Sequence, residues 1–192
     1  MNKKWLLIKS GLLLIVCWLT SLVIVMFFPA MYQKFGVIMC VVFGFCSVGA
    51  SMCIYGNYAL GVGKKLRVID ERASGEDNSK FGLLLGLVPT AINYIYVIIL
   101  FLSKFGVIKY DFYPLYKTLT FYFMPLTYLT APNSAEYVDG AVQSVPVPAT
   151  ELSVGTLVLV TLLPLLFLLI NHISFTVSYK QVDVKSRILY GK

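Results

Sequence analysis

Long apolar runs separated by short polar segments dominate the sequence. Four of these runs reach about 20 residues, the length that a helix needs to cross a hydrocarbon core about 30 Å thick. They lie at about residues 6–28, 35–62, 81–105 and 152–175. The second run is long enough to tilt or to project beyond the membrane. The pattern therefore predicts four transmembrane helices.

Composition agrees with a membrane protein. Of the 192 residues, 58% are hydrophobic and 13% are charged, whereas soluble domains have about 45–50% and about 25%. Mean hydropathy is +0.81. These values argue against a water-soluble globule, a disordered chain and a disulfide scaffold. We predict an all-α integral membrane protein whose residues 1–192 form a single membrane domain.

The positions of Lys and Arg predict the orientation of the helices. Cytoplasmic segments of membrane proteins carry an excess of these residues. Here they cluster at the N-terminus, in the loop 63–80 and in the tail 176–192, while the long segment 106–151 holds only Lys109 and Lys117. We therefore expect both termini and the 63–80 loop in the cytoplasm, and 106–151 outside. The net charge is +7, and the Lys and Arg residues that produce it flank the apolar runs. This arrangement predicts contact with the lipid bilayer and not with nucleic acid.

Aromatic residues gather between Asp111 and Thr130 in the outer segment. The apolar positions recur at helical spacing and are Phe112, Leu115, Tyr116, Leu119, Tyr122, Phe123 and Leu126. We expect an interfacial or re-entrant helix here, with Tyr116, Tyr122 and Phe123 as an outer recognition surface. A fifth span is the alternative, but it would place the basic tail outside. The Pro-containing stretch that follows predicts an exposed loop.

Small residues within the spans indicate where helices approach one another. Gly82 and Gly86 form a GxxxG pattern that Thr90 continues. Ser47 and Ser51 form a second pair of small residues at the same spacing. In lipid, helices associate where small side chains let their backbones come close. Packing within one bundle and a dimer face both fit, and internal packing is favoured because GxxxG is common in apolar segments.

Prolines and polar residues inside the spans predict a kinked, polar interior. Pro89 and Pro164 each lack a backbone N–H and free a carbonyl group. A polar site in the bundle interior would be formed by Asn57, Pro89, Asn93, Thr161 and Pro164. Such a site would suit a small solute, although most kinks of this kind are structural.

The sequence contains no recognisable catalytic or metal-binding constellation. No Asp, Glu, Lys or Arg lies centrally in a span, which argues against proton pumping because such charges form proton and ion paths. The single histidine, His172, has no nucleophile at a suitable spacing. The cysteines have no CxxC spacing and are expected to pack as small apolar residues; they are Cys17, Cys40, Cys46 and Cys53. We expect no enzyme activity, no cofactor and no metal.

The tail from Ser178 to Lys192 reads SYKQVDVKSRILYGK and follows a span that contains proline. A Tyr-Lys turn and a basic, aromatic end at this place resemble the ends of small, uncharacterised multi-pass bacterial membrane proteins, over roughly the last 30 residues. The resemblance implies a bacterial cell (cytoplasmic) membrane and no particular activity.

Two functional hypotheses from different classes follow. The leading one is a non-enzymatic helical bundle, an accessory, immunity-type or anchoring subunit that binds another membrane protein subunit or a second copy of itself. Its support is the lack of charges within the spans, together with the aromatic outer helix and the basic cytoplasmic loop. The alternative is a small transporter or channel component that would use the polar, Pro-kinked interior.

Overall fold

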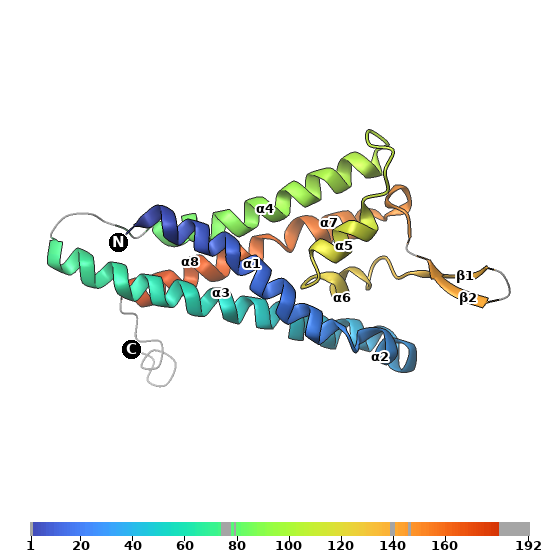
Figure 1. Ribbon diagram of the computed structural model, residues 1–192, viewed down its shortest axis with the longest axis horizontal. Coiled ribbons are helices and arrows are strands. Elements are labelled where there is room, and N and C mark those ends of the chain that lie inside the picture. Colours follow the sequence, from blue (N-terminus) through green and yellow to red (C-terminus); the bar gives the residue numbers. More distant parts are fainter. Residues whose placement is uncertain (1, 74–77, 79, 139–140, 146, 181–192) are drawn as a thin grey trace. The chain divides into compact units, whose positions relative to one another are not determined.

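Helices make up most of the computed structural model, which describes residues 2–73, 78, 80–138, 141–145 and 147–180. Figure 1 shows the helices with one β-hairpin. The helices are α1 (Lys3–Val25), α2 (Phe28–Phe35), α3 (Val37–Ala73), α4 (Phe81–Lys104), α5 (Tyr113–Leu119), α6 (Met124–Thr127), η1 (Ala149–Glu151, a 3₁₀ helix), α7 (Val154–Leu162) and α8 (Leu165–Tyr179). The hairpin consists of β1 (Ser134–Val138) and β2 (Ala141–Val145).

Four helical segments are long and apolar enough to cross a membrane, as the sequence predicts. They are Lys3–Val25, Val37–Glu71, Phe81–Lys104 and Val154–Tyr179. The last of them comprises α7 and α8, which are interrupted at Pro164 because proline cannot donate a helical hydrogen bond.

The second span differs from its predicted end at residue 62, since α3 continues to Ala73. The start of the predicted 63–80 loop is therefore helical. Lys64, Lys65 and Arg67 belong to this extension, and long, unbranched side chains of this kind favour helix. The rest of that predicted loop lies largely outside the described residues, as does most of the tail 176–192.

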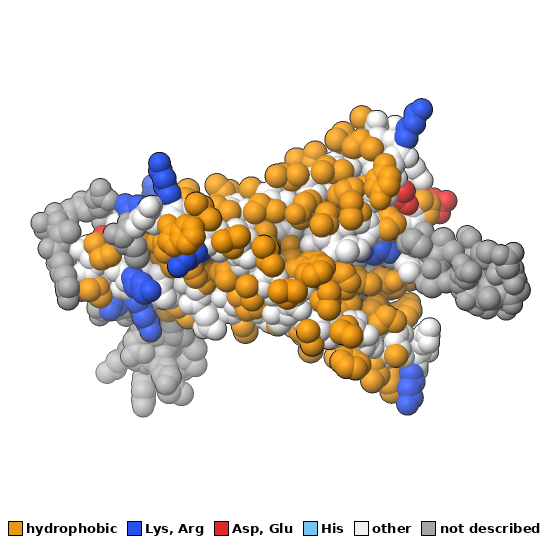
Figure 2. Space-filling view, viewed as in Figure 1, with side chains coloured by type: hydrophobic (Ala, Val, Ile, Leu, Met, Phe, Trp, Pro, Cys, Tyr) orange, Lys and Arg blue, Asp and Glu red, His pale blue; other side chains and the backbone are white. Residues whose placement is uncertain are grey.

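Hydrophobic side chains are spread over the displayed face of the helices (Figure 2). Each of the four spanning segments has large hydrophobic residues that are exposed, among them Ile15, Phe45, Ile98 and Leu169. Large exposed apolar surfaces are unfavourable in water and favourable in contact with lipid. The surface therefore indicates a membrane-embedded protein.

Contacts divide the chain into two compact units. Unit 1 contains Met1–Leu14, Met52–Ala91 and Leu165–Lys192, and unit 2 contains Ile15–Ser51 and Ile92–Pro164. Each unit has a buried core of its own. The single membrane domain expected from the sequence stays a prediction.

Side-chain hydrogen bonds to backbone carbonyls join the helices of unit 1. The Tyr55 hydroxyl on α3 donates to the Ser10 carbonyl on α1 at 2.8 Å. The Ser10 hydroxyl in turn donates to the Leu85 carbonyl on α4 at 2.7 Å. A third bond of this kind, between the Ser178 hydroxyl and the Leu60 carbonyl, joins α8 to α3. Between apolar helices such bonds add to the packing of the side chains.

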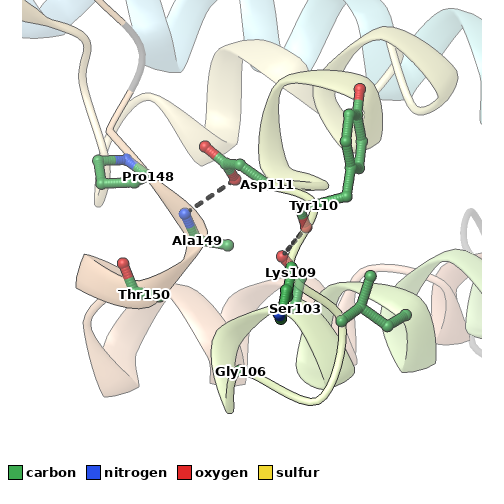
Figure 3. Close-up of a pocket in the computed structure, with 9 residues that line it drawn as sticks. Ser103, Gly106, Lys109, Tyr110, Asp111, Pro148, Ala149 and Thr150 are labelled. Carbon is green, nitrogen blue, oxygen red and sulfur yellow. Dashed lines mark hydrogen bonds between the residues drawn. The ribbon is translucent and has the colours of Figure 1, made fainter.

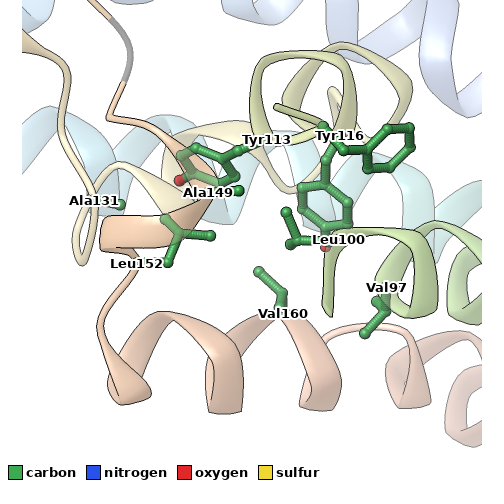
Figure 4. Close-up of a cluster of buried hydrophobic side chains, with 9 residues drawn as sticks. Val97, Leu100, Tyr113, Tyr116, Ala131, Ala149, Leu152 and Val160 are labelled. Atoms are coloured by element: carbon green, nitrogen blue, oxygen red, sulfur yellow. The ribbon is translucent and has the colours of Figure 1, made fainter. Parts of the chain in front are cut away.

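In unit 2, the chain from 106 to 151 folds onto α4 and α7; we call it the cap segment. Figure 4 shows Tyr116 of α5 beside Leu100 of α4, and Tyr113 of α5 near Ala149 and Leu152, in a buried cluster that also contains Val160 of α7. Both aromatic rings are fully buried, and large rings of this kind contribute strongly to a core. The cap segment is thus part of the core of unit 2.

The cap segment departs from the single helix predicted over 111–130. Helix α5 ends at Leu119, and Thr120 has non-helical backbone angles (φ −112°, ψ 45°). A new helix, α6, starts with Pro125 in its first turn. In a continuous helix the Pro125 ring would clash with the Phe121 carbonyl. Two short helices replace the predicted one for this reason.

The stretch predicted as an exposed loop contains the hairpin. Strands β1 and β2 pair antiparallel, with Ser134 opposite Val145 and Val138 opposite Ala141. The sheet has two strands in the described part of the chain. The hairpin projects away from α5 and α6 (Figure 1).

Candidate functional site

A buried cation lies in the cap segment. Lys117 of α5 is 6% exposed, and its Nζ donates a hydrogen bond to Asn133 Oδ1 at 2.9 Å. The same Nζ lies 4.6 Å from the ring centre of Tyr113 and 5.2 Å from that of Tyr128. Aromatic faces attract cations at such distances. The ammonium group is therefore held by one amide oxygen and two tyrosine rings.

The environment of Lys117 changes its ionisation. Burial lowers the pKa of its amine from 10.5 to about 8, and the Asp111 carboxylate opposes this change. Within the described residues, Lys117 forms no ion pair. A lysine is rarely buried without such a partner. The same burial raises the pKa of Tyr113 to about 12, which keeps that neighbouring hydroxyl protonated.

Two hydrogen bonds fix the two ends of the hairpin. Asn133, which accepts from Lys117, directly precedes β1. After β2, the Ala149 N–H donates to Asp111 Oδ1 at 3.0 Å, and Ala149 is buried. Asp111 Oδ1 also accepts from the Tyr113 N–H at 3.1 Å. The chain before β1 is thereby attached to α5. The chain after β2 is attached to Asp111, at the start of the cap segment.

The three aromatic residues of the predicted recognition surface are buried. Tyr116 and Phe123 are 0% exposed and Tyr122 is 1% exposed. The Tyr122 hydroxyl donates to Asn93 Oδ1 at 2.8 Å. Because the cap segment folds onto α4 and α7, these rings face its own core. This burial corrects the prediction that Tyr116, Tyr122 and Phe123 present a surface to a partner.

Three residues of the predicted polar interior, Asn93, Thr161 and Pro164, belong to unit 2. In unit 2, Asn93 bonds to Tyr122, whereas Thr161 donates to the Leu157 carbonyl of its own helix. The Thr161 carbonyl accepts from the Tyr94 hydroxyl at 3.0 Å. Pro164, also in unit 2, is buried after α7.

The two remaining residues of that prediction belong to unit 1. Pro89 is buried within α4, and Asn57 is exposed on α3. The exposure of Asn57 corrects its predicted place in the interior, because α3 turns Tyr55 and Ala59 inward instead.

The GxxxG face of α4 contacts α8 of the same chain. A Cβ atom on Gly86 would lie 2.7 Å from the Leu168 Cα, and one on Gly82 would lie 2.7 Å from the Phe175 Cβ. Thr90 on α4 is buried as well. These approaches favour internal packing, as expected, over a dimer face.

The two serines of the other small-residue pair are also buried. They lie on α3 in unit 2, where the Ser51 hydroxyl donates to the Ser47 carbonyl at 3.0 Å. Cys17 on α1 contacts the Ser51 carbonyl, with a sulfur-to-oxygen distance of 3.9 Å. Ser47 and Ser51 therefore lie in a contact between α1 and α3.

Each of the two units contains a cavity. One, in unit 2, has a volume of about 390 Å³ and is lined by parts of 103–111 and 148–150 (Figure 3). The other, in unit 1, has a volume of about 300 Å³ and lies beside Arg67, Asp70 and Tyr179. In it, Asp70 accepts hydrogen bonds from the Tyr179 hydroxyl at 2.7 Å and from Asn78.

The structure adds little that could hold a metal or a cofactor. Groups of three or more His, Cys, Asp or Glu side chains suited to a metal ion are absent from the described residues. All four cysteines are free. Cys17 and Cys40 are buried as expected for small packing residues, whereas Cys46 and Cys53 are exposed.

Comparisons with protein-family models, curated proteins and solved structures find no match for this chain.

Sequence reasoning missed the residues that organise the cap segment, namely Asp111, Lys117 and Asn133. The available signal was Lys117 itself, a single cation among seven aromatic residues between Asp111 and Thr130. A lysine in such surroundings can bind ring faces. Its contact with Asn133, however, depends on how the chain folds back after α6.

Proposed function

We propose that this protein is a multi-pass protein of the bacterial cytoplasmic membrane, with both termini in the cytoplasm and the cap segment outside. The distribution of Lys and Arg supports this orientation. The four apolar helices support the membrane setting. The cap segment would then be the main part of the chain available to partners on the outer side.

Its proposed role is that of a non-enzymatic subunit that binds another membrane protein through the hairpin of the cap segment. The observation that carries this proposal is the attachment of both ends of the hairpin, by Lys117 to Asn133 and by Asp111 to Ala149. An isolated two-stranded hairpin is marginally stable in water. Here a buried lysine, Lys117, holds the start of the hairpin in place. This costly arrangement supports a hairpin that is presented for binding.

The hairpin also has a suitable chemistry for a protein partner. Each of its strands pairs on one edge with the other strand in the described structure. The free edges carry backbone N–H and C=O groups that an extended segment of a partner can pair with. Backbone pairing of this kind needs no exposed aromatic surface, which agrees with the burial of Tyr116 and Phe123.

The alternative role, a small transporter or channel component, has less support. It would require polar groups free to contact a solute within the spans. Asn93 and Thr161 instead bond to Tyr122 and to a backbone carbonyl of the same helix. Asn57, a third candidate, is exposed.

The test is site-specific photocrosslinking in native membranes. A photoreactive residue at Gln143 in β2 should yield one discrete crosslinked protein, because the hairpin is the proposed contact. The matched control is the same residue at Lys34, an exposed position on α2, which should yield none. A chain with 134–145 replaced by a Gly-Ser linker should lose the partner on co-purification.

The proposal would be wrong if Gln143 gave no crosslink while the protein remained folded. It would also be wrong if the purified protein alone moved a solute across liposomes, since that result supports the transporter hypothesis.

A further inference from the structure

The 390 Å³ cavity of unit 2 lies directly after a spanning helix. Helix α4 ends at Lys104, and the chain then turns at Gly106, whose φ of +72° favours glycine. The far wall of the cavity is formed by Pro148, Ala149 and Thr150 (Figure 3). The volume lies within the range of small-molecule sites, about 300–1,000 Å³.

Two opposite charges line this cavity without pairing. Asp111 and Lys109 are both wall residues, and no ion pair joins them to each other or to another described residue. Asp111 Oδ1 accepts two backbone N–H groups, whereas Oδ2 accepts no hydrogen bond from the part of the chain that the structure describes. One carboxylate oxygen and one ammonium group are thus available to a ligand.

Hydrogen bonds position the Asp111 carboxylate. The Ser103 hydroxyl donates to the Tyr110 carbonyl at 2.8 Å and accepts from the Phe112 N–H at 3.1 Å. These bonds fix the residues on either side of Asp111, and the Ala149 N–H fixes its side chain. Figure 3 shows Asp111 above Ala149, across from Ser103 and Lys109. A carboxylate positioned in advance loses little freedom when it binds a cation.

We propose that this cavity binds a zwitterion, with the ligand's ammonium group on Asp111 and its acidic group on Lys109. A ligand with both charges is favoured because each wall charge would otherwise repel a ligand of its own sign. Two sources have this chemistry: the headgroup of an ethanolamine phospholipid and a free amino acid. The lipid source agrees with the position of the cavity at the end of a spanning helix, the level at which headgroups lie.

This site shares Asp111 with the attachment of the hairpin, but binding of a headgroup does not require a protein partner. The probe is sn-glycero-3-phosphoethanolamine, the soluble headgroup. It is titrated by calorimetry into the full chain in a maltoside detergent, which carries no charge. We expect saturable binding that Asp111→Asn and Lys109→Gln each weaken about tenfold, because each removes one charge-assisted hydrogen bond. Asparagine keeps an oxygen for the Ala149 and Tyr113 N–H groups, and Lys109 is exposed, so both variants should fold.

The control variant is Lys34→Gln, which removes an exposed lysine outside the cavity and should leave binding unchanged. Glycerol 3-phosphate and ethanolamine, each with one of the two charges, should bind at least about tenfold more weakly than the probe. No saturable binding of the probe, equal binding of either single-charge compound, or equal weakening by Lys34→Gln would each overturn the proposal.

The source is decided by two further measurements on the same variants. Retention of phosphatidylethanolamine over phosphatidylglycerol in native mass spectrometry, lost in Lys109→Gln, would identify the lipid. Tighter binding of glycine than of the headgroup probe would identify a free amino acid, with the same zwitterion site.

Discussion

The Tyr122 hydroxyl of the cap segment donates a hydrogen bond to Asn93 Oδ1 of α4 at 2.8 Å, and both side chains are 1% exposed. The sequence pattern assigns Tyr122 to an outer surface and Asn93 to a polar interior. Their bond shows that the two predictions describe one buried contact. It attaches the cap segment to the spanning helix α4.

The first prediction concerns the strength of this contact. Replacing Tyr122 by Phe keeps the ring and removes the donor, so we expect a loss of about 1–2 kcal/mol in the free energy of unfolding. Asn93→Leu should cost a similar amount, and the double variant less than the sum of the two, because each partner then lacks the other. Thermal or denaturant unfolding in detergent measures all three. Strictly additive losses would show that the two side chains do not interact.

The second prediction concerns pH and Lys117. Its pKa is lowered to about 8 in the folded protein, so between pH 8 and 10.5 the unfolded chain binds more protons than the folded one. The free energy of unfolding should therefore rise as the pH increases through this window. Below pH 8 the cost of burying the ammonium is fully present. Since one pKa unit corresponds to about 1.4 kcal/mol, the rise has an upper limit of about 3 kcal/mol.

Lys117→Met is the matched variant for this pH dependence. Methionine keeps most of the side-chain volume and has no proton to lose, so the rise between pH 8 and 10.5 should disappear. Tyr113, with its pKa raised to about 12, should stay protonated over this range. Unfolding curves at pH 7, 8, 9 and 10, followed by near-ultraviolet circular dichroism, give the comparison. An equal slope in both proteins would assign the dependence to other groups.

The sequence alone was sufficient to identify the spanning helices. In lipid, a helix is the local structure in which a run of about 20 apolar residues satisfies its own backbone hydrogen bonds. The predicted span 81–105 accordingly differs from the observed Phe81–Lys104 by one residue at its end. The contact between Gly86 and α8 agrees with the small-residue pattern, because small side chains let two helices come close.

The cap segment could not be predicted in the same way. Lys117, Thr120 and Thr127 fall on the polar side of the helical pattern, yet all three are buried. A periodic pattern predicts one buried side, whereas the chain after α6 folds back and covers the other. The hairpin had a local signal, Asp139-Gly140, a pair typical of two-residue turns. The prolines nearby instead indicated an exposed loop.

The third prediction concerns the glycines of α4. Gly86→Ala should lower the free energy of unfolding by about 2 kcal/mol or more, because the new Cβ would meet backbone atoms of α8 that cannot rotate away. Gly82→Ala should cost less, since the Phe175 side chain it meets can shift. Gly49→Ala on α3 is the control: nothing lies within 4 Å of its added Cβ. It should be neutral or stabilise the helix slightly.

Assembly size should be measured on the same three variants. Size-exclusion chromatography with light scattering should give one mass for Gly86→Ala and the native chain, because the glycine contact lies within one molecule. A smaller assembly with unchanged stability would instead identify α4 as a dimer face.

The last prediction tests the proposed orientation by cysteine labelling in intact cells. The native thiols are first replaced by alanine, because Cys46 and Cys53 are exposed and would react. A cysteine is then placed at Lys65 or at Lys109, both of which are exposed. Lys109→Cys should react with a reagent that does not cross the membrane, since it lies in the cap segment. Lys65→Cys should react only after the cells are opened, because basic segments are retained in the cytoplasm. The reverse pattern would invert the orientation. Labelling of both positions in intact cells would contradict the four-span arrangement, because α4 is the candidate span between residues 65 and 109 and would then not cross the membrane.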